Sequence, residues 1–470
     1  MAKAKIEFGD FQTPRELAML ACERLVSLNI TPTCVVEPTC GLGAFVVASA
    51  NKFNSANRII GVDINEAYIA ALSSELQCIS KQNLIDLKVG DFFSFDWKNL
   101  FSSEGEDILI VGNLPWVTNT VQSKIDGNNI PNKDNVVGLS GFDAISGKAN
   151  FDISEWMMIS LIKTTIGNKI DIAMMLKTSV ARKILSYIEK NKIPCCYSEI
   201  IFIDAKKEFG ASVDACFFIV RFNPNAEAVY DYRVFESFAD PCGRLCGHRD
   251  GYLVSDIESF NESKMFISNS PQKWRSGVKH DASAVMELKV KNGALVNGFD
   301  EVVDIEDEMI YPLIKGSIIG SGKDWNQRYA IVTQYNVGGD TDYIKDLYPK
   351  AWEYLNKHAS QLDGRKSVIY KNNPRFSIFG VGEYTFKPWK IAICGLYKKI
   401  SFTVIGPING KAVVFDDTVY FVSFETEEEA NAVFEKLCSD EVLKAINSMI
   451  FWDEKRPIKA GILNVINWAL

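Results

Sequence analysis

Two short apolar segments near the N-terminus each end in an acidic residue and are separated by a glycine-containing turn. Cys34–Glu37 leads into Pro38–Phe45, which contains Gly41-Leu42-Gly43, and then into a helical run. A strand, a Gly-x-Gly turn and a helix form the layout that lets the backbone approach a nucleotide-like ligand. The second strand, Arg58–Asp63, ends in a carboxylate 20 residues after Gly43, which is the separation at which such an acid can bind ribose hydroxyls. We therefore expect an α/β domain with a nucleotide-like ligand.

A third predicted strand, Leu87–Gly90, is followed by Asp91 and Phe92. These two residues offer an acceptor for an adenine amine and a ring for its face. Further along, Ile170–Leu176 and Ala215–Phe222 have the unbroken apolar character of buried strands. The first helix is expected to begin at Phe11–Glu16, with Thr13 as cap, Pro14 at the first helical position and Glu16 completing a capping box.

A fourth strand joins Asn113, Pro115 and Trp116 in the segment Ile108–Trp116, a combination that suits chemistry on a planar amine. A primary aromatic amine such as adenine N6 is a poor nucleophile because its lone pair is delocalised into the ring. The Asn113 side-chain oxygen and a backbone carbonyl before Pro115 can accept its two protons, while Trp116 stacks on the base. Taken alone, the segment also fits a strand followed by a turn and a packing Trp.

The segment resembles the catalytic motif of the amino-methyltransferases. That motif is usually Asn-Pro-Pro-Tyr/Phe/Trp in DNA N6-adenine enzymes and Asn-Leu/Ile-Pro-Tyr in RNA adenine dimethyltransferases; Leu114 follows the RNA pattern and Trp116 the DNA pattern. The motif order resembles the N6-adenine DNA methyltransferases of type II restriction-modification systems. The resemblance implies a Rossmann-like, S-adenosylmethionine-dependent methyltransferase domain with a mixed, mostly parallel sheet over residues 1–228. It also implies a C-terminal α+β target-recognition domain over residues 229–470.

The same resemblance assigns S-adenosylmethionine as cofactor and Asn113, Leu114, Pro115 and Trp116 as catalytic residues. The cofactor-binding residues, in order from the methionine end to the adenine ring, would be Phe11, Thr13, Pro14, Glu37, Cys40, Gly41, Asp63, Ile64, Asp91 and Phe92, joined by Asn113. Glu37 beside the glycines would repel a pyrophosphate, and the third glycine of the dinucleotide fingerprint is absent. Both features favour a cationic sulfonium.

Two segments are candidates for contact with the target base. Lys207–Gly210 lies where the family often places an aromatic residue against the face of the flipped adenine opposite the catalytic ring, so Phe209 is a candidate stacking residue, with ordinary packing as the alternative. The long polar stretch Asp126–Asn150 suits a substrate loop that becomes ordered on nucleic acid. A disordered insertion is the alternative.

Charge is distributed unevenly along the chain. The whole chain has 51 Lys and Arg against 59 Asp and Glu, whereas residues 311–411 hold 15 against 7 and leave 36 against 52 elsewhere. Basic residues within this region alternate with aromatic ones, a pattern that indicates a nucleic-acid footprint, although a solvated surface would look similar. The expected partners are double-stranded DNA and a cognate restriction endonuclease. The candidate DNA-binding residues are Arg275, Lys279, Lys315, Arg365, Lys366, Lys371 and Arg375.

Other features set the broad class of protein. The composition is 47% hydrophobic with no run of membrane-spanning length, so a cytoplasmic protein with no membrane contact is expected. Cys242, Cys246 and His248 cluster, but a closed zinc site needs four ligands, so no metal is expected. The predicted function is site-specific methylation of a flipped adenine in DNA. RNA adenine methylation and a catalytically inactive DNA-binding relative remain as alternatives.

Overall fold

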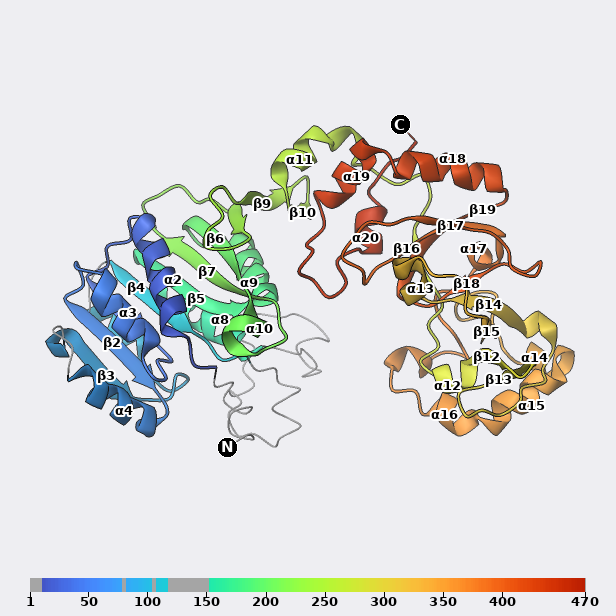
Figure 1. The fold of residues 1–470 in the computed structure, drawn as a ribbon, viewed down its shortest axis with the longest axis horizontal. Helices are drawn as coiled ribbons and strands as arrows, with labels where there is room; N and C mark the ends of the chain where they lie inside the picture. The colour runs from blue at the N-terminus through green and yellow to red at the C-terminus, as the bar shows by residue number, and fades with distance from the viewer. Residues whose placement is uncertain (1–10, 78–81, 104–106, 117–151, 470) are drawn as a thin grey trace. The chain divides into compact units, whose positions relative to one another are not determined.

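The computed structural model describes residues 11–77, 82–103, 107–116 and 152–469 (Figure 1). The stretch Asp126–Asn150, expected to be a substrate loop, lies outside these residues. Two compact units, Met1–Leu253 and Val254–Leu470, make up the chain and are described separately. Within the described part of the chain, no helix is long and apolar enough to cross a lipid bilayer.

The first unit is built on a ten-stranded sheet with the order β10-β9-β8-β6-β7-β5-β4-β1-β2-β3. Its strands are β1 (Cys34–Glu37), β2 (Arg58–Asp63), β3 (Ile85–Val89), β4 (Ile108–Asn113), β5 (Ile170–Lys177), β6 (Cys195–Ile203), β7 (Ala215–Phe222), β8 (Tyr232–Phe235), β9 (Arg244–Arg249) and β10 (Tyr252–Val254). Strands β1 to β6 run parallel to one another and β7 runs antiparallel between β5 and β6. The expected mixed, largely parallel sheet is confirmed.

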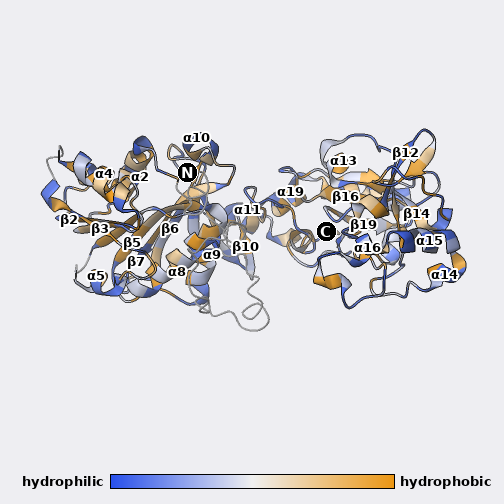
Figure 2. Ribbon diagram, turned by 90° about the horizontal axis from the view of Figure 1, so that it is seen from below, coloured by the Kyte–Doolittle hydropathy of each residue, from blue (hydrophilic) through white to orange (hydrophobic). Residues whose placement is uncertain are grey.

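Helices cover both faces of this sheet. They are α2 (Arg15–Ser27), α3 (Ala44–Lys52), α4 (Glu66–Leu76), α5 (Trp97–Ser103), α8 (Ile153–Thr165), α9 (Thr178–Lys190) and α10 (Ala205–Phe209). Helices α5, α8 and α9 share one hydrophobic cluster with the sheet, and α2, α3 and α4 share the other. The central strands accordingly lie in the hydrophobic range of Figure 2, as expected for a sheet buried on both sides.

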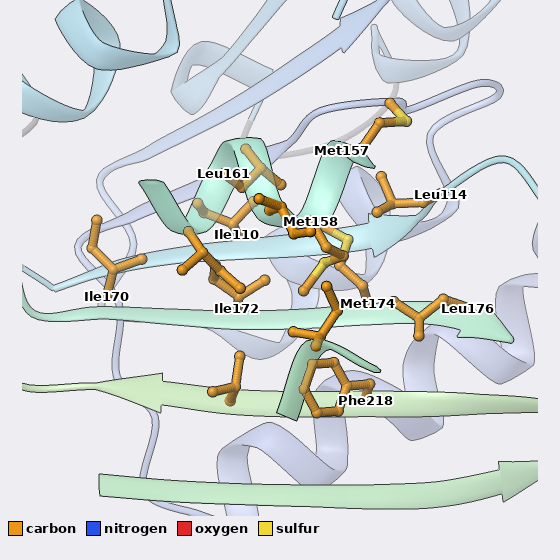
Figure 3. Packing of buried hydrophobic residues seen from close by; sticks show 14 of the residues in the cluster. Ile110, Leu114, Met157, Met158, Leu161, Ile170, Ile172, Met174, Leu176 and Phe218 are labelled. Carbon is orange, nitrogen blue, oxygen red and sulfur yellow. The ribbon is translucent and has the colours of Figure 1, made fainter. Parts of the chain in front are cut away.

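Alternation along the strands divides the side chains between the two clusters. On β5, Ile172 and Met174 face the cluster that contains α8, whereas Ala173 and Met175 face the cluster that contains α2 and α3. Figure 3 shows Met157, Met158 and Leu161 of α8 on the side of the sheet that Ile172 and Met174 face. Successive side chains in a strand point to opposite faces, so unbroken apolar runs are needed to fill both cores.

The sheet order brings the polar strand ends together. Strand β1 lies between β2 and β4, so the strand order reverses at β1, and in open α/β sheets ligands bind outside the carboxyl ends at such a switch point. Glu37, Asp63 and Asn113 are the last residues of β1, β2 and β4, and Asp91 follows β3. Because these four strands are parallel, all four polar residues lie at one edge.

Two local predictions differ from the structure. Helix α2 begins at Arg15 with Pro14 as its N-cap, and no side chain caps it, so the capping box predicted for Thr13 and Glu16 is wrong. The Pro14 carbonyl accepts the first helical hydrogen bond from the Ala18 N–H, which leaves Thr13 outside the helix. The sheet also continues beyond the expected boundary at residue 228, because β8, β9 and β10 add to its β6 edge.

The second unit contains two smaller sheets, with orders β11-β19-β16-β17 and β13-β12-β15-β14-β18. Its strands are β11 (Arg275–Ser276), β12 (Glu287–Lys291), β13 (Ala294–Val296), β14 (Ile310–Ile314), β15 (Arg328–Ile331), β16 (Trp389–Cys394), β17 (Thr403–Ile405), β18 (Val414–Phe415) and β19 (Val419–Phe424). Its helices are α11 (Ile257–Glu262), α12 (Ser283–Met286), α13 (Gly316–Ser321), α14 (Tyr343–Leu347), α15 (Pro349–Lys357), α16 (Ala359–Asp363), α17 (Glu383–Phe386), α18 (Glu427–Leu437), α19 (Asp440–Asn447) and α20 (Ala460–Leu463).

The two-sided core of the first unit gives a stability prediction. Ile172 is 0% exposed at the centre of the sheet, so Ile172→Ala should lower the free energy of unfolding by about 2–5 kcal/mol through lost burial and a residual cavity. Ile166 is 55% exposed, and Ile166→Ala should change it by less than about 0.5 kcal/mol. Chemical denaturation of both variants checks this, and equal costs would contradict the packing described.

Candidate active site

A cavity of about 720 Å³ opens at the carboxyl ends of β1 to β4. The residues predicted to bind the cofactor that line it are Phe11, Thr13, Glu37, Cys40, Gly41, Asp63, Ile64, Asp91, Phe92 and Asn113. Pro14 does not line the cavity. Sequence reasoning missed several lining residues, among them Gln12, Thr39, Tyr68 and Met157. Met157 belongs to α8 and lies some forty residues after the turn that follows Asn113, so no local signal marks it.

The cavity wall is acidic. Its lining includes the carboxylates of Glu37, Asp63, Glu66 and Asp91, and none of its described lining residues is Lys, Arg or His. Burial raises the pKa of Glu37 well above its ordinary value, and the charge of Asp63 raises it further, against a lowering by the Val46 N–H that donates to Glu37 Oε2 at 2.9 Å. A wall of this charge favours a cationic ligand.

The turn after β1 is held close to the cavity by hydrogen bonds. Gly41 has φ +50° and its N–H donates to Asp63 Oδ2 at 2.7 Å, while the Leu42 N–H donates to Gln12 Oε1 at 2.9 Å. A Cβ on Gly41 would lie 2.6 Å from Gln12 Oε1, so both backbone conformation and space favour glycine there. The turn thus joins β2 to the segment before α2.

The Asn113 side chain is oriented by one hydrogen bond. Its Nδ2 donates to the Phe11 carbonyl at 3.0 Å, whereas its Oδ1 is buried and accepts no hydrogen bond from any described residue. A buried acceptor without a donor is unfavourable by roughly 1–3 kcal/mol. The amide therefore presents a free acceptor that a donor on a bound molecule would satisfy.

Hydrogen bonds of its backbone groups, one of them with the Thr39 side chain, fix the turn that follows Asn113. The Leu114 N–H donates to the Met175 carbonyl at 3.3 Å, and the Thr39 hydroxyl donates to the Asn113 carbonyl at 3.1 Å. A proline at position 114 has no N–H and could not make the first of these bonds. Leu114 is also 1% exposed, so packing and hydrogen bonding restrain this turn although the first proline of the related motifs is absent.

Three aromatic rings meet beside Asn113. The Trp116 ring lies edge to face against Phe209 with centroids 4.9 Å apart, and Phe11 lies 5.5 Å from Trp116 and 6.4 Å from Phe209. The structure therefore brings the two predicted stacking residues together, in direct contact with one another. Phe11 was predicted only as a cofactor neighbour, and its ring completes the group.

The candidate DNA-binding residues differ in whether their charged groups already interact with other residues of the protein. Arg365 donates to three backbone carbonyls, Arg375 pairs with Asp363, and Lys315 pairs with Glu287. Arg275 stacks on Tyr384, and Lys279 lies 3.7 Å from Asp281. Lys366 and Lys371 are exposed, and no described residue pairs with them.

One part of the expected basic and aromatic footprint is wrong. Lys390 is 0% exposed and its Nζ donates to the Lys387 carbonyl at 2.6 Å; burial lowers its pKa to about 7. Phe376 is also buried. Strand β16 carries Lys390 into the core, so alternation of basic and aromatic residues here partly reflects an ordinary buried strand.

The cysteine cluster of the first unit has a different arrangement from a metal site. His248 Nδ1 lies 2.5 Å from Glu189 Oε2, and Cys246 is buried while Cys242 is exposed. Among the residues that the structure describes, no group of three or more His, Cys, Asp or Glu could hold a metal ion.

Comparison with known proteins identifies relatives of this chain. No protein-family model matches it. It is 47% identical over 467 residues to the type II methyltransferase M.NspV of Nostoc sp.. This match covers 99% of this chain and 97% of that protein. A shorter match, 31% identical over 134 residues, joins 28% of this chain to 31% of the type II methyltransferase M.CvrRI of Paramecium bursaria Chlorella virus XZ-6E.

A solved structure shares the fold. The type IIL restriction-modification enzyme MmeI, determined in complex with DNA, matches with a TM-score of 0.56 and 11% identity over 98% of this chain and 65% of the MmeI chain. This chain thus spans just under two thirds of that protein. The first unit has the fold of S-adenosylmethionine-dependent methyltransferases, and S-adenosylmethionine is the cofactor. With close sequence identity over nearly its whole length, the chain belongs to the type II methyltransferases.

Proposed function

We propose that this protein methylates N6 of a specific adenine in double-stranded DNA and protects that DNA in a restriction-modification system. The observation that carries the proposal is the Asn113 amide, whose Nδ2 is bound to the Phe11 carbonyl and whose buried Oδ1 has no hydrogen-bond donor among the residues that the structure describes. An exocyclic amine with two N–H donors satisfies that acceptor. The relationship to M.NspV and the shared fold with the DNA-bound enzyme MmeI support DNA as the substrate.

The catalytic turn would activate the amine without a covalent intermediate. Asn113 Oδ1 would accept a hydrogen bond from one amino N–H and the Leu114 carbonyl from the other, which localises the nitrogen lone pair for attack; as the N–CH3 bond forms, the sulfonium would leave as a neutral thioether and one amino proton would pass to solvent. S-adenosylmethionine supplies an electrophilic methyl group on a sulfonium. Pro115 restrains the turn, and alignment of the amine with the methyl group provides much of the rate.

The aromatic rings would hold the flipped base. Trp116 stacks on one face of the adenine and Phe209 on the other. The two ring centroids are 4.9 Å apart, and the rings contact each other directly. A base stacked between them needs one aromatic contact distance on each face, so the rings must be roughly 7 Å apart. We therefore expect α10, which ends at Phe209, to shift when DNA binds.

The acidic cavity would hold the cofactor. Its volume and its lack of lining cations fit a ligand that carries a sulfonium and an ammonium group. Glu37, Cys40 and Gly41 would lie at the amino-acid and sulfonium end, beside Phe11, Thr13 and Pro14. Asp63 and Ile64 would bind the ribose, and Asp91 and Phe92 the adenine ring. The first unit would thus catalyse transfer, and the second would select the DNA sequence.

Sequencing tests the proposal as a whole. The intact chain is expressed in a methylation-free host, and genomic DNA is sequenced by a single-molecule method that detects modified bases. N6-methyladenine confined to one short sequence is the expected result. Unmodified DNA together with methylated adenine in host RNA would overturn the assignment of DNA as substrate.

Asn113→Ala should abolish methyl transfer while cofactor binding persists. Loss of a positioned acceptor is expected to lower kcat by at least about 100-fold, because the developing charge on the amine is no longer stabilised. The exposed Asn99 on α5 provides a matched control, since Asn99→Ala removes the same group away from the cavity. Transfer by Asn113→Ala equal to that of Asn99→Ala would refute the role. Calorimetric titration with S-adenosylmethionine tests binding in both variants.

Thr39→Val tests the rigidity of the catalytic turn. Valine keeps the volume but removes the hydroxyl that donates to the Asn113 carbonyl, so the Leu114 carbonyl is held less firmly. We expect kcat to fall roughly 5- to 10-fold, which corresponds to the free energy of about one hydrogen bond, with the KM for DNA little changed. Thr39→Ser should restore kcat. A rise in KM at constant kcat would show that Thr39 acts in substrate binding instead.

The raised pKa of Glu37 predicts pH-dependent cofactor binding. A bound cation favours the carboxylate form, so binding should release a proton and affinity should rise with pH up to the pKa of the free protein. Glu37→Gln should weaken binding and flatten this dependence, whereas Glu66→Gln, at an exposed position of the same cavity, should leave the slope unchanged. Calorimetry in buffers of different ionisation enthalpy measures the proton. A wild-type affinity independent of pH would contradict the role of Glu37.

A further inference from the structure

The second unit buries a carboxylate beneath two cations. Glu287, at the start of β12, has a side chain 7% exposed, and its two oxygens lie 2.9 and 3.0 Å from Lys315 Nζ. Arg328 Nη1, on β15, donates to Glu287 Oε2 at 3.3 Å. A buried charge is tolerated only when it is paired and hydrogen-bonded, so Glu287 fixes both cationic groups in place.

The cluster carries one positive charge more than pairing requires. His280 Nε2 lies 3.6 Å from Glu287, but burial lowers the pKa of His280, which leaves it neutral at physiological pH. Lys315 and Arg328 therefore share one carboxylate, that of Glu287, among the ion pairs of the described residues. Their side chains remain 32% and 39% exposed, so the excess charge lies at the surface.

Arg328 keeps most of its hydrogen-bonding capacity. A guanidinium has five N–H donors in a planar fork, and a purely structural pairing with a carboxylate is commonly bidentate. Here Nη1 alone contacts Glu287, and Nε and Nη2 donate to no residue in the described part of the chain. A planar group with two parallel acceptors would fit the free side of the fork.

The backbone around Arg328 is also held rigidly. Trp325 Nε1 donates to the carbonyls of Leu313 and Arg328, both at 3.1 Å, and so ties the end of β14 to the start of β15. Lys289 stands opposite Arg328 in the β12–β15 ladder, on the same face, and its ammonium pairs with Asp300 at 3.2 Å, so it does not compete with Arg328 for Glu287. Groups already held in place lose little conformational entropy when they bind a ligand.

We propose that Arg328 and Lys315, positioned by Glu287, form a DNA contact of the second unit. This inference rests on the proposed function. The guanidinium fork matches guanine O6 and N7 in the major groove and also matches two oxygens of a phosphate, and Lys315 supplies a second donor to the same acceptor group. The region 311–411, which contains both residues, has 15 basic against 7 acidic residues and attracts a polyanion.

Variants of the intact chain test this contact. Arg328→Ala and Lys315→Ala are compared with Lys350→Ala, which also removes one positive charge, from an exposed pair with Asp304 in the same unit. We expect DNA affinity to fall roughly 5- to 150-fold in the first two variants and to remain near wild type in the control. Fluorescence anisotropy with duplex DNA over a series of salt concentrations measures this.

A contact with a guanine base and a contact with a phosphate give different results. For a base contact, the methylated sequence in Arg328→Ala becomes relaxed at one position. For a phosphate contact, the sequence is unchanged and the slope of log affinity against log salt becomes smaller by about 1. Both results support the proposal. Affinity and methylated sequence that match Lys350→Ala in both variants would overturn it.

Further controls keep the result interpretable. If the wild-type chain neither binds nor methylates DNA, the proposed function fails, whatever the variants do. If wild type methylates DNA and both variants behave as the control, only the present inference fails. Arg328→Lys keeps the charge and loses the fork, so a loss of affinity in this variant, with melting temperature and cofactor binding unchanged, supports the contact independently of folding.

Discussion

The hydrogen bond from Asn113 Nδ2 to the Phe11 carbonyl determines what this site can do. It settles the orientation of the amide and leaves Oδ1 as a buried acceptor to which no residue in the described part of the chain donates. The preceding loop is itself held by Gln12, which accepts from the turn after β1. One short segment before α2 therefore contacts both the glycine turn and the Asn113 amide, so the orientation of Asn113 depends on the structure of the cavity at the strand ends.

The sheet makes this arrangement possible. Four parallel strands deliver Glu37, Asp63, Asp91 and Asn113 to one edge, where the strand order reverses. Apolar side chains from these strands fill the cores on both faces of the sheet, while Glu37, Asp63 and Asn113 stand where β1, β2 and β4 end. Concentrated carboxylates disfavour anions there. Burial of Glu37 raises its pKa, and a cation bound beside it would favour the carboxylate form.

Sequence reasoning succeeded where the signal was local. The strands β1, β2 and β7 have the predicted bounds, and β4 lies within the segment singled out for it, because each is a short apolar run ended by a turn or a polar residue. It failed where tertiary contacts decide: Lys390 belongs by sequence to the basic region 311–411 but lies in the core, and Thr13 does not cap α2. The pairing of Glu287 with Arg328 joins residues 41 positions apart, and neither residue is marked by its neighbours. The substrate roles of the site residues remain predictions.

In the proposed mechanism, Asn113 Oδ1 and the Leu114 carbonyl accept hydrogen bonds from the two N–H groups of an adenine amine. Mass spectrometry of nucleosides from duplex DNA, methylated by the purified protein with isotopically labelled S-adenosylmethionine, tests it most directly. The account predicts labelled N6-methyladenine as the product and no labelled nucleoside from Asn113→Ala. Label in methylcytosine, or equal labelling by the variant, would contradict it.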